Sequence, residues 1–123
     1  MVKDPNISLL SEAGQLLLDK KAYNIIAIEV KSFSTMTDYF LVAEESIERH
    51  VGALARYLID LFAEKGRKPL HIEGQKTGDW IVLDYGDFVI HLMETEMREK
   101  YRLEEIWKED KIVDLKLKVL SEI

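Results

Sequence analysis

The segment from residue 78 to residue 93 sets the architecture, and it runs Gly78-Asp79-Trp80-Ile81-Val82-Leu83-Asp84-Tyr85-Gly86-Asp87-Phe88-Val89-Ile90-His91-Leu92-Met93. It contains two strand-like runs that are joined at Gly86-Asp87. Side chains alternate between the two faces of a strand, so a two-residue turn here determines which residues share a face. One face then pairs Tyr85 with Phe88, Leu83 with Ile90 and Ile81 with Leu92. This face is wholly apolar, and we expect it to form the core.

The opposite face of the hairpin, which we call the mixed face, combines chemically different side chains. It pairs Trp80 with Met93, Val82 with His91 and Asp84 with Val89. Such a mixture suits recognition of a partner better than plain packing, although Trp80 alone could equally cap the edge of the core. A three-residue turn would move Trp80 into the core with Ile90 and Leu92, and would leave Tyr85, His91 and Met93 outward. The position of Trp80 therefore depends on the turn, whereas His91 and Met93 belong to the mixed face in either register.

Length and composition predict one globular domain. The chain has 123 residues, of which 47% are hydrophobic and 33% are charged, so it can bury a core without covalent staples. It contains no cysteine, which excludes disulfides and thiolate metal sites and favours a reducing compartment. No apolar run reaches the length of a membrane span, and no signal-peptide core is present. We therefore expect a cytoplasmic protein that does not engage membranes.

The charge balance indicates the kind of partner. The formal net charge is −6, and the most basic run, residues 65–68, is short. Phosphate backbones would repel such a chain, so direct readout of nucleic acid is not expected. A basic protein partner fits the charge better, although an acidic surface that only maintains solubility would account for it equally well.

Around the hairpin, apolar spacing and turn residues predict an α/β fold. A helix is expected from Ile7 to Leu18, with Ser8 or Ser11 as its N-cap. A second helix is expected from the N-cap Ser46 to about Lys65, and Gly66 would end it. The remaining expected elements are antiparallel strands over 23–30 and 39–43, a short strand over 70–72, and a short helix that Thr95 caps and that ends near Tyr101. This order predicts an α/β sandwich, in which helices flank a mixed β-sheet.

The C-terminal segment is ambiguous. Leu115, Leu117 and Val119 alternate as in a strand, whereas Ile112, Leu115 and Val119 also keep helical spacing. The abundance of Lys, Glu and Leu favours a helix. We therefore expect a single domain over residues 1–108 and a helical extension over residues 109–123.

The sequence offers little for catalysis. Asp38, Asp84 and Asp87 could serve a divergent metal-dependent nucleotidyltransferase, which is the alternative function. However, no Gly-Ser pair precedes an Asp-x-Asp strand, no Gly-rich phosphate loop or G-x-S-x-G turn occurs, and the three histidines lack ligand spacing. We therefore expect no catalytic residue, no metal and no cofactor.

Several motifs in order resemble the ribosomal silencing factor family, also called the Iojap-like family. They are Thr37-Asp38-Tyr39-Phe40; Arg49-His50-Val51; Pro69 followed by Glu73-Gly74; the run from Asp79 to Asp87 with Val89 and His91; and Glu96, Arg98, Tyr101, Leu103, Glu104 and Trp107. The resemblance covers about residues 7 to 108. It implies a nucleotidyltransferase-like fold without the catalytic signature.

The resemblance also implies a function. Family members bind the large ribosomal subunit through ribosomal protein L14 at the intersubunit face, block joining of the small subunit sterically and slow translation when nutrients are short. They often form homodimers. The contact residues implied for this chain are Trp80, Asp84, Tyr85, Asp87 and Met93, and the position of His91 on the mixed face adds it to them.

The chain departs from the family pattern in two places. A Gly-x-Ser-x-Arg sequence usually precedes the long helix, and here Glu45 replaces the glycine and Ile47 replaces the serine. The tail from about Glu109 to Ile123 extends past the pattern, and we expect it to lie outside the family domain.

Overall fold

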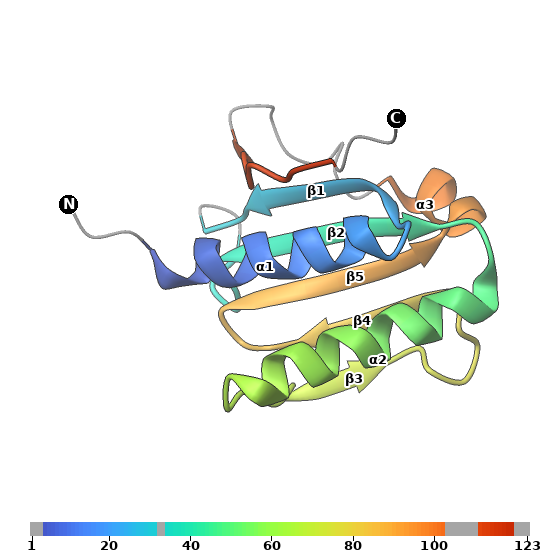
Figure 1. Ribbon diagram of the computed structural model, residues 1–123, viewed down its shortest axis with the longest axis horizontal. Helices are drawn as coiled ribbons and strands as arrows, with labels where there is room; N and C mark the ends of the chain where they lie inside the picture. The colour runs from blue at the N-terminus through green and yellow to red at the C-terminus, as the bar shows by residue number, and fades with distance from the viewer. Residues whose placement is uncertain (1–3, 32–33, 103–110, 120–123) are drawn as a thin grey trace.

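The computed structural model describes residues 4–31, 34–102 and 111–119. One six-stranded sheet in the order β3-β4-β5-β2-β1-β6 carries α1 and α2 on one face, and α3 lies at the end of β5 (Figure 1). The helices are α1 (Pro5–Asp19), α2 (Glu48–Glu64) and α3 (Thr95–Tyr101), and the strands are β1 (Tyr23–Glu29), β2 (Tyr39–Glu45), β3 (His71–Glu73), β4 (Trp80–Asp84), β5 (Phe88–Glu94) and β6 (Ile112–Val113). The expected mixed sheet with flanking helices is confirmed. In these three described ranges, no helix has the length and apolar character that crossing a membrane requires.

The hairpin has the register of a two-residue turn. Tyr85 N–H donates to the carbonyl of Phe88 at 3.0 Å, and Trp80 lies opposite Met93. Gly86 adopts φ +86°, a conformation that glycine reaches at no steric cost. The alternative three-residue turn is thereby excluded. The apolar face of the hairpin packs into the core beneath both helices, as expected.

The strands on either side of the hairpin complete the sheet. β1 and β2 pair antiparallel, as predicted, and β2 pairs with β5 in parallel over seven residues. The parallel pair requires a crossover, and α2 lies in the connection that spans it, against the core face.

The N-caps expected for all three helices are wrong, and at α3 Glu94 takes the place expected for Thr95. Asp4 caps α1, because its Oδ1 accepts from the N–H of Asn6 at 2.9 Å, and Pro5 follows at the first helical position. Ser8 and Ser11 lie inside this helix. Ile47, not Ser46, occupies the N-cap position of α2 and makes no side-chain cap.

Glu45 binds the backbone of the loop that leads into α2. Its Oε1 accepts from the backbone N–H of Ser46 at 2.9 Å and of Ile47 at 3.4 Å. The residue that departs from the family pattern therefore organises this loop itself. At the other end, Gly66 takes φ +75°, so the expected glycine terminator is confirmed.

The described part of the tail, residues 111–119, is not helical. Ile112 and Val113 form β6, which pairs antiparallel with β1 opposite Ile28 and Ala27. The expected helix is therefore wrong for these residues, because strand pairing and side-chain alternation outweigh local helix propensity. Three residues of the last family motif, Leu103, Glu104 and Trp107, lie outside the described residues.

The tail then packs along α1. A Cβ on Gly14 would lie only 3.0 Å from Leu115 Cδ1 and 3.2 Å from Leu117 Cδ2, so the glycine makes room for both leucines. Ser11 Oγ also donates to the carbonyl of Leu115. Residues 111–119 are thus part of the same packed unit as the sheet and α1.

Candidate protein-binding site

The mixed face is the side of the sheet that α1 and α2 leave uncovered (Figure 1). Cross-strand pairing places three neighbouring strands in register on it. The side chains that share this face are Trp80, Val82 and Asp84 from β4, Val89, His91 and Met93 from β5, and Phe40, Val42 and Glu44 from β2. The turn at Gly86-Asp87 therefore positions Trp80 outside the core.

Four rings form a row across this face, which we call the aromatic row. Phe40 and His91 lie with ring centroids 4.8 Å apart, His91 and Trp80 lie 5.9 Å apart, and Trp80 and Tyr101 lie 5.0 Å apart. Tyr101 comes from the last turn of α3 and is 44% exposed, while Trp80 is partly exposed. The row therefore ends in an accessible aromatic pair that could fill a pocket on a partner.

His91 is held in one protonation state. Trp80 Nε1–H donates to His91 Nδ1 at 3.1 Å, so the single proton of the neutral imidazole sits on Nε2. Burial of the ring lowers the pKa of His91 to about 4, and it is neutral at pH 7. Its Nε2 is buried and has no hydrogen-bond partner among the residues that the structure describes.

Two of the expected contact residues are buried. Tyr85 is 4% exposed, and its ring packs on the rings of Phe62 and Phe88, with centroid distances of 4.6 Å and 5.3 Å. This burial raises the pKa of Tyr85 to about 12. Met93 has no exposed surface. Neither side chain offers accessible surface to a partner in this conformation.

The two aspartates of the expected set lie at the hairpin turn. Asp84 Oδ1 accepts from the N–H of Gly86 at 2.8 Å, which stabilises the turn. Asp87 is exposed and pairs with Arg67 at 3.8 Å. The same guanidinium also donates to the carbonyl of Tyr85 at 3.4 Å. Both aspartates remain accessible, but their first role is to hold the turn.

These carboxylates do not build a metal centre. Within residues 4–31, 34–102 and 111–119, no three Asp, Glu, His or Cys side chains converge so as to hold a metal ion. Asp38 approaches the turn only through its backbone N–H, which donates to the carbonyl of Asp87 at 3.0 Å. No observation therefore favours the nucleotidyltransferase alternative.

Tyr101 is the residue of this site that sequence analysis missed. It lies 21 residues after Trp80, on a different element, and no local spacing links the two. The signal available was the seven-residue helix that directly follows β5, because such a helix must fold back at the end of the hairpin where Trp80 lies.

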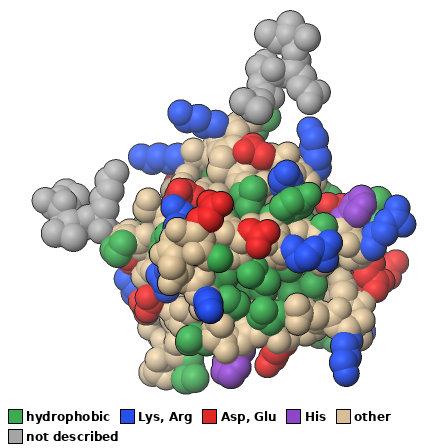
Figure 2. Space-filling model, turned by 60° about the horizontal axis from the view of Figure 1, so that its bottom comes forward, with side chains coloured by type: hydrophobic (Ala, Val, Ile, Leu, Met, Phe, Trp, Pro, Cys, Tyr) green, Lys and Arg blue, Asp and Glu red, His purple; other side chains and the backbone are tan. Residues whose placement is uncertain are grey.

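A second exposed apolar area lies at the edge of the molecule formed by α2 and β3. Figure 2 brings the edge of α2 and β3 forward and shows hydrophobic side chains gathered in the middle, with charged side chains around them. Leu70, which precedes β3, is 65% exposed. This edge lacks the combination of rings and a buried imidazole found on the mixed face, so it is the weaker candidate.

Comparison with known proteins identifies the family of the chain. Residues 3–122 match the family model described as "Ribosomal silencing factor during starvation". The chain is 33% identical over 110 residues to a ribosomal silencing factor of Halalkalibacterium halodurans, covering 89% of this chain and 94% of the relative. It is 36% identical over 95 residues to a mouse protein named "Mitochondrial assembly of ribosomal large subunit protein 1", covering 75% of this chain and 42% of that protein.

A solved structure agrees with the fold. A crystal structure of a Chromobacterium violaceum protein superposes with a TM-score of 0.76 at 29% identity, covering 86% of this chain and 87% of the other. The family match reaches residue 122, so the expectation that the tail lies outside the family pattern is wrong. With the motifs, the fold and a match over nearly its whole length in agreement, the chain belongs to the ribosomal silencing factor family.

Proposed function

We propose that this protein binds ribosomal protein L14 on the large ribosomal subunit and sterically blocks joining of the small subunit. It would thereby repress translation in the cytoplasm under nutrient limitation, without catalysing a reaction. The observation that carries this proposal is the accessible pair of Trp80 and Tyr101 on the mixed face. Large aromatic side chains with rigid neighbours are typical anchors of protein interfaces.

Charge supports a protein partner over direct contact with ribosomal RNA. The net charge of −6 disfavours phosphate backbones, and Glu73 and Asp84 lie on the β3–β4 side of the aromatic row, whereas Lys100 lies over the Tyr101 ring at its other end. His71 and Glu73 on β3 are exposed next to Asp84 and Val82, and Asp79 directly precedes Trp80. A basic surface on the partner would complement this arrangement.

The relatives support the ribosome as the target. The family description names ribosomal silencing during starvation, and the mouse relative is named for assembly of the mitochondrial ribosomal large subunit. Both names concern the ribosome, and the second specifies the large subunit. We extend this target to the present chain and assign the contact to Trp80 and Tyr101, the accessible end of the aromatic row.

Co-sedimentation with purified large subunits tests the proposal. Trp80→Ala should weaken binding at least about tenfold, because loss of an aromatic anchor typically costs about 2 kcal/mol. Added small subunits should compete with the wild-type protein. A folded Trp80→Ala variant that binds as well as wild type would overturn the site, and absence of wild-type binding would overturn the function. Leu70→Ser probes the rival area at the β3 edge and should leave binding unchanged.

A further inference from the structure

His91 lies at the centre of the aromatic row but cannot itself reach a partner. The residue is 8% exposed, and it sits on β5 between Val82 of β4 and Val42 of β2. Its ring is flanked by Phe40 and Trp80. A buried imidazole in the middle of a sheet face costs desolvation, so it needs an explanation beyond filling space.

We propose that His91 is a positioning residue, which acts by holding the Trp80 indole in the orientation that a partner recognises. This inference rests on the proposed function, because it concerns how the same surface is prepared for binding. It replaces the expectation that His91 is a contact residue.

The geometry gives the mechanism. The indole N–H donates to His91 Nδ1 at 3.1 Å, and Tyr101 lies against the same indole at 5.0 Å between ring centroids. The hydrogen bond restrains the side-chain torsions of Trp80, while the Tyr101 ring limits movement on another side. A side chain that is ordered before binding loses less conformational entropy on association, which improves affinity. Without the acceptor, the partly exposed indole would sample other rotamers.

The acceptor must be a neutral imidazole with its proton on Nε2. A protonated imidazole has a donor at both nitrogens and cannot accept from Trp80. Nitrogen-15 NMR of the free protein should therefore report His91 as the Nε2–H tautomer. The Trp80 indole N–H should give one sharp resonance that is protected from exchange, assigned by its loss in Trp80→Phe.

Two substitutions separate the acceptor from the bulk of the ring. His91→Asn places an oxygen close to the position of Nδ1 and keeps an acceptor for the indole, whereas His91→Leu is apolar and removes it. We expect His91→Leu to weaken binding to large subunits about five- to tenfold, the effect of one lost hydrogen bond. His91→Asn should restore most of that loss. Thermal unfolding of each variant checks that it is folded.

A double-mutant cycle tests whether His91 acts through Trp80. In a Trp80→Phe background, which has no indole N–H, His91→Leu should cost no further affinity. An equal cost in both backgrounds, or a His91→Asn variant no better than His91→Leu, would overturn the proposal. If wild-type protein does not bind large subunits, the proposed function fails. The NMR measurement on the free protein then still decides the positioning, since a rapidly exchanging, broadened indole N–H would overturn it.

Discussion

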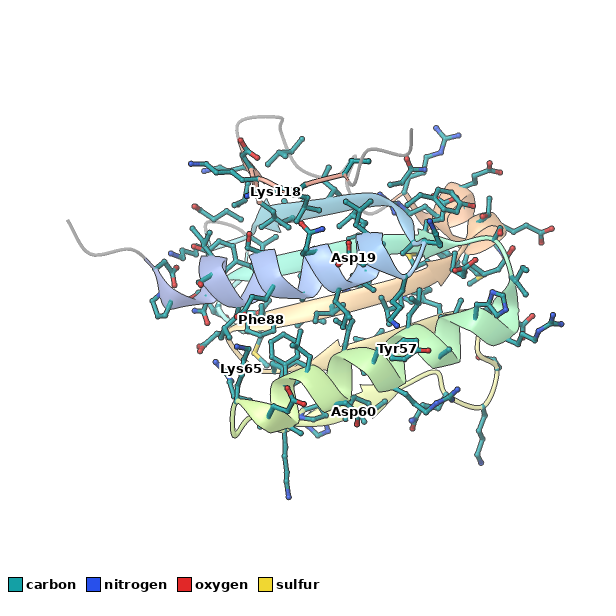
Figure 3. The ribbon with its side chains drawn as sticks, viewed as in Figure 1. Asp19, Tyr57, Asp60, Lys65, Phe88 and Lys118 are labelled. Atoms are coloured by element: carbon teal, nitrogen blue, oxygen red, sulfur yellow. The ribbon has the colours of Figure 1, made fainter. Side chains whose placement is uncertain are left out.

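Gln15 on α1 and Lys118 in the tail exchange two hydrogen bonds. The Gln15 amide donates through Nε2 to the Lys118 carbonyl and accepts through Oε1 from the Lys118 N–H, each at 2.9 Å. The side chain thus pairs with the backbone as a neighbouring strand would. In Figure 3, the labelled Lys118 lies above α1.

Gln15→Ala should loosen the tail without unfolding the domain. Removal of the two hydrogen bonds to the tail, and of a third from Gln15 Nε2 to Asp19 Oδ1 at 3.0 Å, should lower the free energy of unfolding by about 1 kcal/mol. Hydrogen exchange should show loss of protection at Lys118, while the amides of β2 and β5 stay protected. Unchanged protection at Lys118 in Gln15→Ala would contradict this role.

Stability should depend on the protonation of His91. Burial lowers the pKa of His91 in the folded state to about 4, below its usual 6.5, so the unfolded chain takes up the proton first as the pH falls. Stability contributed by the neutral imidazole is therefore complete above pH 6.5 and decreases towards pH 4. The total loss should be about 3 kcal/mol.

The comparison of wild type with His91→Leu isolates this effect, because all other groups titrate in both proteins. Chemical denaturation at several pH values should give a free energy of unfolding that falls more steeply in wild type between pH 6.5 and 4. Parallel curves for the two proteins would show that His91 titrates normally in the folded state.

Tyr101 and Tyr57 form a matched pair for testing the binding face. Each is 44% exposed and each has a lysine ammonium over its ring, but Tyr57 lies on α2, on the opposite side of the sheet (Figure 3). Tyr101→Ala should weaken binding to large subunits by about tenfold, as expected for loss of an interface aromatic. Tyr57→Ala should leave it unchanged. Equal effects of the two substitutions would place the contact elsewhere.

Gly74 is the glycine most closely tied to the position of Trp80. It adopts φ +87°, and a Cβ there would lie 1.9 Å from the Trp80 carbonyl oxygen. Gly74→Ala must therefore displace the start of β4, and we expect a loss of about 2 kcal/mol or more in stability together with weaker binding to large subunits.

Gly66 provides the control for this substitution. It has a similar φ of +75°, but nothing lies within 4 Å of the added Cβ. Gly66→Ala should cost only the backbone strain, about 1 kcal/mol, and should not affect binding. A Gly74→Ala variant no less stable than Gly66→Ala would contradict the close approach.

The sequence predicted the hairpin well because its geometry is local. A two-residue turn determines which residues lie opposite each other, from Tyr85–Phe88 to Trp80–Met93, and therefore which face of the sheet each side chain occupies. No distant contact can change this without shifting the register. The same alternation places Tyr85 in the core, and the structure confirms this. The family resemblance had implied a contact role for Tyr85, which its burial leaves unsupported.

The errors arose where distant partners decide the outcome. Ile112 and Val113 form a strand because β1 offers them an open edge some 85 residues earlier in the chain, although the composition of the tail favours a helix. Tyr101 joins Trp80 only through the placement of α3. At the start of α2, the Ser46 hydroxyl donates to Glu45 Oε1 at 3.4 Å and does not cap the helix.

The contact of the tail with α1 has a consequence for folding of the chain. Ser11 and Gln15 meet Leu115 and Lys118 across more than 100 residues. Contacts of such long sequence separation slow folding. Until residues 111–119 dock, the surface beside Gly14 lacks its two leucines, so the packing of α1 is completed only when these distant segments meet.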